Sequence, residues 1–213
     1  MIPIAILFDL DGTIIDSEPI IIQAWKIAHE KICPFIEWDE NKLIRLMGQP
    51  AEVIPQNMGI PTEFHQEYEA AFDLYLENMY LPLFEDVLIV LEWMKNKSIP
   101  LCIVTGAKTE EARQILEQNK IKHFFTEIIG ADLTERGKPF PDPINFALSK
   151  LNLSSELKKV LFIGDSLNDL LSAQAAGVIP VLVWRKDYKI PENLTKNADI
   201  VIPNLVKLLD ILE

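Results

Sequence analysis

The chain has 213 residues, of which 49% are hydrophobic, and its 20 lysine and arginine residues against 32 aspartate and glutamate residues give a formal net charge of −12. A chain of this length and composition can bury a full hydrophobic core, so we expect a folded protein rather than an intrinsically disordered one. Because lysine and arginine gather in no stretch, as a polyanion-binding surface would require, we expect neither nucleic acid nor a membrane as a partner.

The amino-terminal segment, MIPIAILFD, is apolar but lacks the basic leader of a signal peptide. No apolar run in the sequence approaches the roughly 18 residues that a membrane-spanning helix needs. We therefore expect a cytoplasmic protein, in which residues 4–8 form the first strand of a sheet.

Short, continuous apolar runs bounded by turn residues predict strands that are buried on both faces, as in a parallel sheet. They cover residues 4–8, 100–104, 127–130, 159–163, 179–184 and 199–202. Segments of helical period alternate with them at residues 85–97, 108–119, 142–152, 167–176 and 204–212. This alternation predicts an α/β fold with a Rossmann-like, doubly wound parallel sheet.

One long stretch interrupts the alternation, because residues 17–82 contain no strand-like run. The stretch consists of amphipathic segments instead, namely IIIQAWKIAHEKI, DENKLIRLM, AEVIPQNM and EFHQEYEAAFDLYLENMY. Since a βα connection needs only a few residues, the simplest interpretation is a helical insert. We predict an α/β core domain of residues 1–16 and 83–213 and an inserted helical cap domain of residues 17–82. Helices that only extend the core are the alternative.

The two cysteines, Cys33 and Cys102, lie far apart in the sequence, and the second falls inside an apolar strand pattern. This pattern is typical of buried free thiols, so we predict neither a disulfide nor a metal site there. The three histidines are scattered without the spacing of metal ligands, and we assign them no role.

Polar residues follow the apolar runs at several strand ends, which is where an open α/β fold places its chemistry. The first run ends in FDLDGT, with carboxylates at Asp9 and Asp11 before a glycine that permits a tight turn. Two later runs end in Thr105-Gly106 and Gly164-Asp165. An Asp-x-Asp pair alone is common in solvated loops, and it is the combination of strand ends that indicates a shared site.

Together with Lys138 before a Pro-x-Pro segment and Asp169 four residues after Asp165, these groups resemble the motifs of the haloacid dehalogenase superfamily. The resemblance is to the branch of phosphoglycolate phosphatase and β-phosphoglucomutase, whose helical cap is inserted directly after the first motif. It covers nearly the whole chain with every motif in order, so chance agreement is improbable. It implies an enzyme, a phosphoric monoester hydrolase of this superfamily.

The resemblance implies a role for each motif residue. Asp9 would be the nucleophile that attacks phosphorus and forms an aspartyl-phosphate, and Asp11 would be the general acid and base. Thr105 and the backbone N–H of Gly106 would bind phosphate oxygens. Lys138 would lie between the Asp9 carboxylate and the phosphoryl group and reduce their repulsion.

The resemblance also implies a Mg²⁺ cofactor. The ion would be held by Asp9, by the backbone carbonyl of Asp11 and by Asp165, because magnesium prefers hard oxygen ligands. Asp169 would orient ligands or water around it. Taken alone, Asp165 and Asp169 would be ordinary carboxylates at a helix start.

The residues at several positions limit the class of reaction that the resemblance implies. A dehalogenase, a phosphonate hydrolase or a P-type ATPase would not carry Asp at the position of Asp11, and β-phosphoglucomutase would carry Glu and His where this chain has Gly164 and Ile21. We therefore predict a Mg²⁺-dependent phosphatase of small soluble phosphate esters, such as phosphoglycolate, a sugar phosphate or a nucleoside monophosphate. A β-phosphoglucomutase-like phosphomutase and a non-catalytic phosphoryl-binding module are the alternatives.

The cap would select the substrate. Arg45 is the only arginine of residues 17–82, and in the resembling family the loop at this place faces the active site. Arg45, Gln49 and Lys26 are therefore candidates for binding the distal part of the substrate. A solvated helix arginine is the alternative for Arg45.

Overall fold

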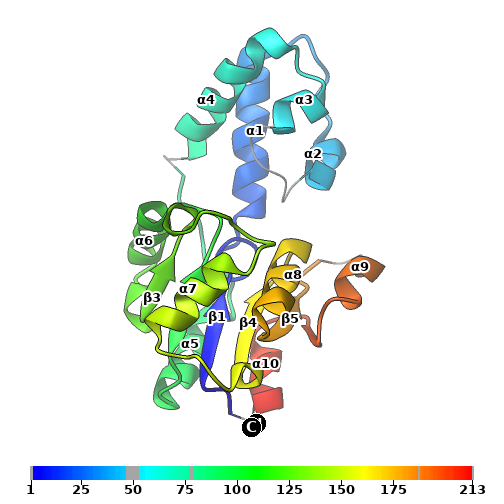
Figure 1. Ribbon diagram of the computed structural model, residues 1–213. Helices are drawn as coiled ribbons and strands as arrows, with labels where there is room; N and C mark the ends of the chain where they lie inside the picture. The colour runs from blue at the N-terminus through cyan, green and yellow to red at the C-terminus, as the bar shows by residue number, and fades with distance from the viewer. Residues whose placement is uncertain (1, 47–52, 77–78, 187, 213) are drawn as a thin grey trace. The chain divides into compact units, whose positions relative to one another are not determined.

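The computed structural model of the protein describes residues 2–46, 53–76, 79–186 and 188–212. Its sheet is six-stranded, entirely parallel and ordered β3-β2-β1-β4-β5-β6 (Figure 1). The strands are Ala5–Phe8 (β1), Leu101–Val104 (β2), Glu127–Ile129 (β3), Val160–Gly164 (β4), Ile179–Val183 (β5) and Ile200–Ile202 (β6). The chain runs outward from β1 through β2 to β3 on one side of the sheet. It then crosses back to β4, which lies beside β1, and runs outward through β5 to β6 on the other side. This reversal makes the carboxyl ends of β1 and β4 a topological switch point.

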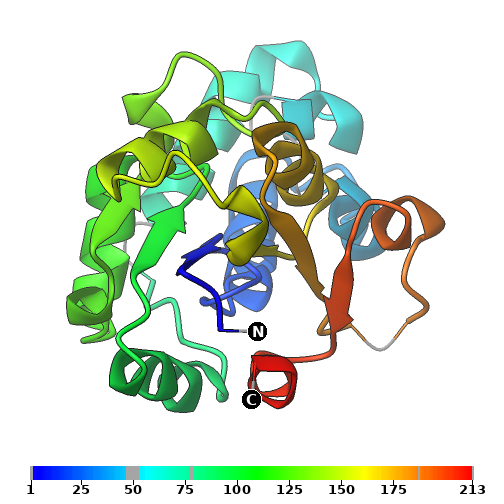
Figure 2. The same cartoon turned by 60° about the horizontal axis from the view of Figure 1, so that its bottom comes forward.

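Helices cover both faces of the sheet, as parallel crossovers require. Helices α5 and α10 pack together on one face, while α7 and α8 pack together on the other (Figure 2). The α-helices of this part of the chain are Val87–Asn96 (α5), Thr109–Gln118 (α6), Asp142–Lys150 (α7), Leu167–Ala176 (α8), Glu192–Thr195 (α9) and Val206–Leu212 (α10). Short 3₁₀ helices lie at Lys122–Phe124, Ala131–Leu133 and Leu157–Lys159.

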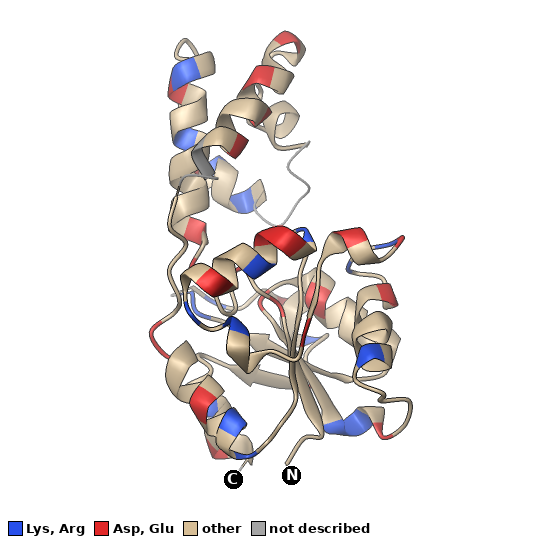
Figure 3. Ribbon diagram, turned by 90° about the vertical axis from the view of Figure 1, so that its left-hand side faces the viewer, with Lys and Arg blue, Asp and Glu red and all other residues tan. Residues whose placement is uncertain are grey.

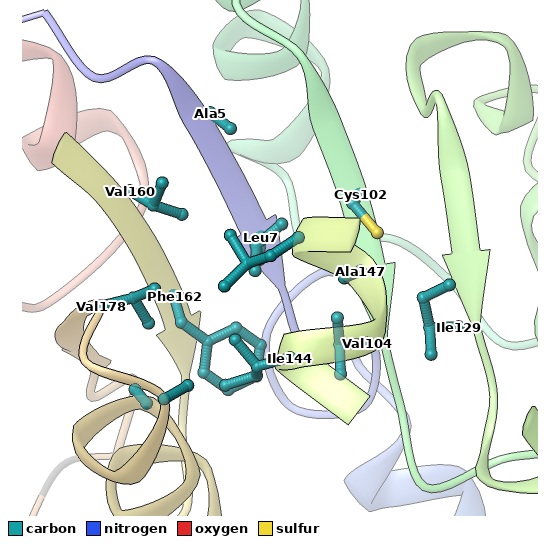
Figure 4. Close-up of a cluster of buried hydrophobic side chains, with 13 residues drawn as sticks. Ala5, Leu7, Cys102, Val104, Ile129, Ile144, Ala147, Val160, Phe162 and Val178 are labelled. Atoms are coloured by element: carbon teal, nitrogen blue, oxygen red, sulfur yellow. The ribbon is translucent and has the colours of Figure 1, made fainter. Parts of the chain in front are cut away.

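A buried hydrophobic cluster joins the sheet to α7 and α8 (Figure 4). Leu7 lies in register with Cys102 on one neighbouring strand and with Phe162 on the other. Ile144 and Ala147 of α7 belong to the same cluster. Because burying a side chain such as Leu or Phe stabilises the fold by about 1.5–3 kcal/mol, the cluster fixes the strands whose ends carry polar residues.

Residues Asp16–Leu81 form a separate compact unit made of helices. They are Glu18–Ile32 (α1), Glu40–Leu46 (α2), Ile54–Met58 (α3), the 3₁₀ helix Thr62–Phe64 and His65–Leu76 (α4). Its core contains an aromatic stack, in which Trp25 packs on Phe72 with ring centroids 4.0 Å apart and on Tyr68 at 5.2 Å. His29 is buried in this core, and its ring nitrogens lie 2.7 Å from the carbonyl oxygen of Ile36 and 3.3 Å from the Tyr68 hydroxyl. With both nitrogens partnered, His29 is a structural residue of the unit.

The other unit contains Met1–Ile15 and Pro82–Glu213, so the chain leaves it at Ile15 and returns at Pro82. Ile15 forms an antiparallel bridge with Leu83, and the backbone N–H of Phe84 donates to the Ile14 carbonyl at 3.2 Å. The two crossing segments, where the chain leaves the sheet-containing unit near Ile15 and returns to it near Pro82, are therefore tied to each other within that unit.

The predicted fold class is confirmed. Each predicted strand is present with bounds that differ by no more than one residue, and the sheet is parallel and doubly wound. Both cysteines are buried and free, as expected. Helix α9 was not predicted, because four residues are too few to carry a helical period. Among the helices described, none is both long and apolar enough to span a membrane.

Charged residues of both signs are interspersed along the helices (Figure 3). Many form exposed pairs one helical turn apart, such as Arg113 with Glu110 and Lys207 with Asp210. Such pairs contribute little to stability. This distribution gives no support to a polyanion-binding surface.

Candidate active site

The carboxyl ends of three adjacent strands bring predicted site residues together. Asp9 follows β1, Thr105 follows β2 and Asp165 follows β4, and β1 lies between the other two strands. The backbone N–H of Asp9 donates to the carbonyl of Ile163 at 2.8 Å, and that of Thr105 donates to Ile129 at 2.9 Å. The ladder of the sheet thus extends to the site residues and fixes their backbone at the switch point.

Lys138 lies between two buried carboxylates. Its ammonium group donates to Oδ1 of Asp9 and to Oδ1 of Asp169, each at 2.6 Å. The side chains of Lys138 and Asp9 are each 10% exposed and that of Asp169 is 1% exposed. Charge-assisted hydrogen bonds so shielded from water hold the ammonium group firmly beside Asp9.

Two contacts fix the loop that carries Lys138. Before it, Arg136 forms a two-pronged ion pair with Asp142, at 3.1 Å and 3.0 Å. After it, the buried hydroxyl of Ser172 on α8 donates to the carbonyl of Phe140 at 2.7 Å. The position of the ammonium group is therefore set by the loop as well as by its carboxylate partners.

Asp169 is anchored by Ser166, a residue to which the sequence analysis gave no role. Oδ2 of Asp169 accepts hydrogen bonds from the backbone N–H of Ser166 at 3.0 Å and from its hydroxyl at 2.5 Å. The pair forms a capping box at the start of α8, and its S-x-x-D spacing is a signal that could have been read in the sequence. Because Oδ1 of Asp169 binds Lys138, both of its oxygens are engaged.

Burial and crowded carboxylates change the titration of the site. Burial and the nearby Asp169 carboxylate raise the pKa of Asp9 well above its ordinary value, although Lys138 opposes the change. The same causes raise the pKa of Asp165 to about 7. Burial lowers the pKa of Lys138, but the carboxylates of Asp169 and Asp9 outweigh it and raise that pKa above its ordinary value. Three carboxylates thus face one ammonium group, and negative charge is in excess.

A divalent cation fits this excess of charge. Carboxylate oxygens of Asp9, Asp165 and Asp169 lie within 4.8 Å of one another. Within the part of the chain that the structure describes, Asp165 and Oδ2 of Asp9 accept no hydrogen bond, whereas both Asp169 oxygens do. Oxygen donors without other partners are suited to a hard metal ion.

The turn that carries Asp11 lies directly against Asp165. Gly12 has a φ of +71°, in the left-handed region that favours glycine. A Cβ atom at this position would also collide with the Asp165 carboxylate. The backbone after Asp11 and the Asp165 side chain are therefore immediate neighbours, which only glycine permits.

Thr105 and Gly106 border the site from β2. The buried Oγ1 of Thr105 accepts a hydrogen bond from the backbone N–H of Ala107 at 3.1 Å, which leaves its proton free to be donated to an anionic oxygen. Gly106 is exposed, and a Cβ atom there would meet nothing within 4 Å. Its backbone therefore borders open space.

The predicted substrate-binding residues of the insert belong to the helical unit. Arg45 is exposed in the last turn of α2, and no ion pair reaches it from the described residues. Lys26 is exposed on α1, and Gln49 lies outside the described residues. A substrate contact by any of the three stays a prediction.

A cavity of about 460 Å³ lies at the amino-terminal end of β2, on the side of the sheet away from the candidate active site. Its lining includes Leu101, the first residue of β2, and residues Lys95 and Lys150 at the ends of α5 and α7. Thr105 follows the other end of β2, so this cavity is separate from the candidate active site.

The chain matches known proteins over nearly its full length. The model of the haloacid dehalogenase-like hydrolase family matches residues 6–183. A relative from Photobacterium profundum named phosphoglycolate phosphatase is 30% identical and covers 98% of this chain and 95% of the relative. A relative from Caldanaerobacter subterraneus subsp. tengcongensis, with the provisional name pyrophosphatase PpaX, is 32% identical over 98% and 94% of the two chains. A crystal structure from Haemophilus somnus, described as a predicted phosphoglycolate phosphatase, has a TM-score of 0.86 at 26% identity, covering 100% of this chain and 99% of its own.

The chain therefore belongs to the haloacid dehalogenase-like hydrolase family. The match confirms both the predicted family and the predicted enzyme class, a phosphatase. Phosphatases of this family generally use a metal ion, and the buried acidic cluster of Asp9, Asp165 and Asp169 is present.

Proposed function

We propose that the protein is a Mg²⁺-dependent phosphatase that hydrolyses small phosphate monoesters through an aspartyl-phosphate on Asp9. The observation that carries the proposal is the contact of 2.6 Å between Asp9 and Lys138 at the switch point. In this contact the carboxylate that we propose as the nucleophile lies beside a fixed cation, and the carboxylate of Asp165 belongs to the same acidic cluster.

In the first step, an oxygen of Asp9 attacks phosphorus, and the bond from phosphorus to the ester oxygen breaks. Asp11 donates a proton to that oxygen, which leaves as an alcohol, and such general acid catalysis contributes typically ~10²- to 10⁴-fold. Lys138 offsets the charge of Asp9, so the repulsion between the two anions falls. Thr105 and the backbone N–H of Gly106 donate to the phosphoryl oxygens as charge builds on them.

In the second step, water attacks phosphorus of the aspartyl-phosphate while Asp11 accepts a proton from that water. The bond between phosphorus and the Asp9 oxygen breaks, which releases inorganic phosphate and restores the carboxylate. Asp169 keeps Lys138 in place throughout, because it forms the second hydrogen bond to the ammonium group.

The carboxylates of Asp9 and Asp165 and the backbone carbonyl of Asp11 are the proposed ligands of Mg²⁺. When bound, the ion supplies positive charge that offsets the phosphoryl group and the carboxylates. Asp169 is left out of this set because its oxygens bind Ser166 and Lys138.

Hydrolysis is favoured over the phosphomutase reaction by the surroundings of Gly164. A side chain at this position would collide with the side chain of Asp169. The Glu expected there in a β-phosphoglucomutase therefore has no room while Asp169 occupies the space. Asp169 is in turn held by Lys138 and Ser166, so it cannot simply move aside.

Removal of the metal tests the proposal directly. We expect p-nitrophenyl phosphate hydrolysis to fall to background in EDTA and to return when Mg²⁺ is added. Loss of a residue that only supports a metal ligand typically costs roughly 10- to 100-fold in metal affinity. Asp165→Asn removes a proposed direct ligand, so it should raise the Mg²⁺ concentration needed for half-maximal rate by more than that. Asp210→Asn, in an exposed pair on α10, serves as the matched control.

Full activity in EDTA would overturn the metal site. Absence of hydrolysis with Mg²⁺ would instead favour the phosphoryl-binding module. A substrate panel should begin with phosphoglycolate and pyrophosphate, because relatives carry these names, and should include sugar phosphates and nucleoside monophosphates. Conversion of glucose 1-phosphate to glucose 6-phosphate with its bisphosphate would identify a mutase.

A substitution at Arg45 tests whether the helical insert takes part in substrate selection. We expect Arg45→Ala to lower kcat/KM for the best substrate by about ten- to over a hundredfold, the value of one charge-assisted hydrogen bond. Acetyl phosphate, which is too small to use such a contact, should be scarcely affected. The comparison is a rate measurement on both substrates with Arg113→Ala, an exposed arginine of α6, as control. Equal losses on both substrates would assign Arg45 a structural role.

A further inference from the structure

Arg185 is a largely buried arginine that the reaction described above does not use. It lies two residues after β5, at the same edge of the sheet as Asp9 and Asp165, and its side chain is 15% exposed. Burying a guanidinium group is unfavourable unless it is paired and hydrogen-bonded. Its partners therefore indicate what the burial accomplishes.

The guanidinium group contacts both segments through which the chain passes between its two units. Nη2 donates to the carbonyl oxygen of Thr13 at 3.2 Å, just before the chain leaves at Ile15. The same nitrogen lies 3.0 Å from Oδ1 of Asp86, just after the chain returns at Pro82. The guanidinium carbon also lies 3.9 Å from the centre of the Phe84 ring, within reach of a cation–π interaction.

Asp86 is itself fixed, because its Oδ2 accepts a hydrogen bond from the backbone N–H of Leu205 at 2.5 Å. Arg185 thus joins the end of β5, the residues before α10 and both crossing segments at one buried point. A flat guanidinium group suits this position, since it can stack on a ring and donate in its own plane.

Movement at Thr13 would be transmitted to the proposed general acid. The backbone N–H groups of Ile14 and Ile15 both donate to the Leu10 carbonyl at 2.9 Å, and Gly12 donates to Ile15 at 2.9 Å. Asp11 and Ile15 form a bridge in the same turn. A turn closed on itself in this way moves as one piece, so a contact with Thr13 also positions Asp11.

We propose that Arg185 is a positioning residue that holds the turn containing Asp11 in place for proton transfer to the leaving group, by clamping Thr13 to Phe84 and Asp86. This inference rests on the proposed phosphatase function. It adds a residue that acts through Asp11 without touching the substrate.

The test compares p-nitrophenyl phosphate with phenyl phosphate, two esters of similar shape whose leaving groups differ in their need for a proton. We expect Arg185→Met to raise the ratio of kcat/KM for p-nitrophenyl phosphate to that for phenyl phosphate by about fivefold or more, because only the poorer leaving group depends strongly on general acid catalysis. Arg185→Lys should give an intermediate ratio. Arg113→Met, from an exposed pair on α6, should leave the ratio unchanged.

If Arg185→Met does not fold, the same ratio is measured in Arg185→Met/Asp86→Asn, which removes the unpaired carboxylate and keeps an acceptor for Leu205. An unchanged ratio, whether kcat/KM for both esters falls by the same factor or stays at the wild-type value, would overturn the positioning role and leave the phosphatase function standing. Wild-type protein that hydrolyses neither ester with Mg²⁺ would overturn the phosphatase function and this inference with it.

Discussion

Replacement of Asp9 by asparagine is expected to reduce phosphatase activity at least about a thousandfold, because the amide fills the same volume but cannot attack phosphorus. The fold should survive. Burial and the Asp169 carboxylate raise the pKa of Asp9, so its ionised form is disfavoured in the folded state, and a neutral isostere removes that disadvantage. We expect the free energy of unfolding, measured by urea titration in EDTA, to be unchanged or higher.

Steady-state hydrolysis of p-nitrophenyl phosphate with saturating Mg²⁺ is the measurement for Asp9→Asn. Asp73→Asn provides a matched control, because Asp73 is an exposed carboxylate on α4. Residual activity above a tenth of wild type would remove Asp9 from the role of nucleophile. Loss of both activity and cooperative unfolding would show that Asp9 is needed for the fold instead.

The strands were predictable because their physical signal is local. A strand buried on both faces is a continuous apolar run, as in AILF of β1 and LCIV of β2, and glycine or polar residues mark where it ends. The order of the strands across the sheet has no such local signal. It depends on which crossover helices pack on which face, as α7 and α8 do on the cluster around Phe162.

Only part of the candidate site could be predicted from the sequence, again because only local features leave a signal there. The motif residues at the strand ends could be assembled because parallel strands bring their carboxyl ends to one edge. The partners that hold them are separated from them in sequence and look like ordinary surface residues. Nothing local distinguishes Arg185 from a solvated loop arginine, although its partner Thr13 lies 172 positions away. Ser166 was the exception, since its spacing to Asp169 is that of a capping box.

Substitutions at Lys138 can distinguish its effect on catalysis from its effect on the stability of the fold. We expect Lys138→Met to lower kcat about 10²- to 10³-fold, the usual cost of losing one group that stabilises charge in the transition state. It should also destabilise the fold by roughly 3–5 kcal/mol, because the carboxylate of Asp169 is 1% exposed and loses its cation. Both changes are measured on the same preparation, by steady-state kinetics and by urea unfolding.

The double variant Lys138→Met/Asp169→Asn separates the two effects. Neutralising Asp169 removes the buried unpaired charge while its side-chain carbonyl can still accept a hydrogen bond from Ser166, so most of the lost stability should return. Activity should not return, because no cation then faces Asp9. Lys159→Met, which breaks an exposed pair with Glu156, should change neither quantity appreciably. A double variant that recovered activity together with stability would mean that Lys138 serves the fold alone, and the charge beside Asp9 would then have to come from the metal.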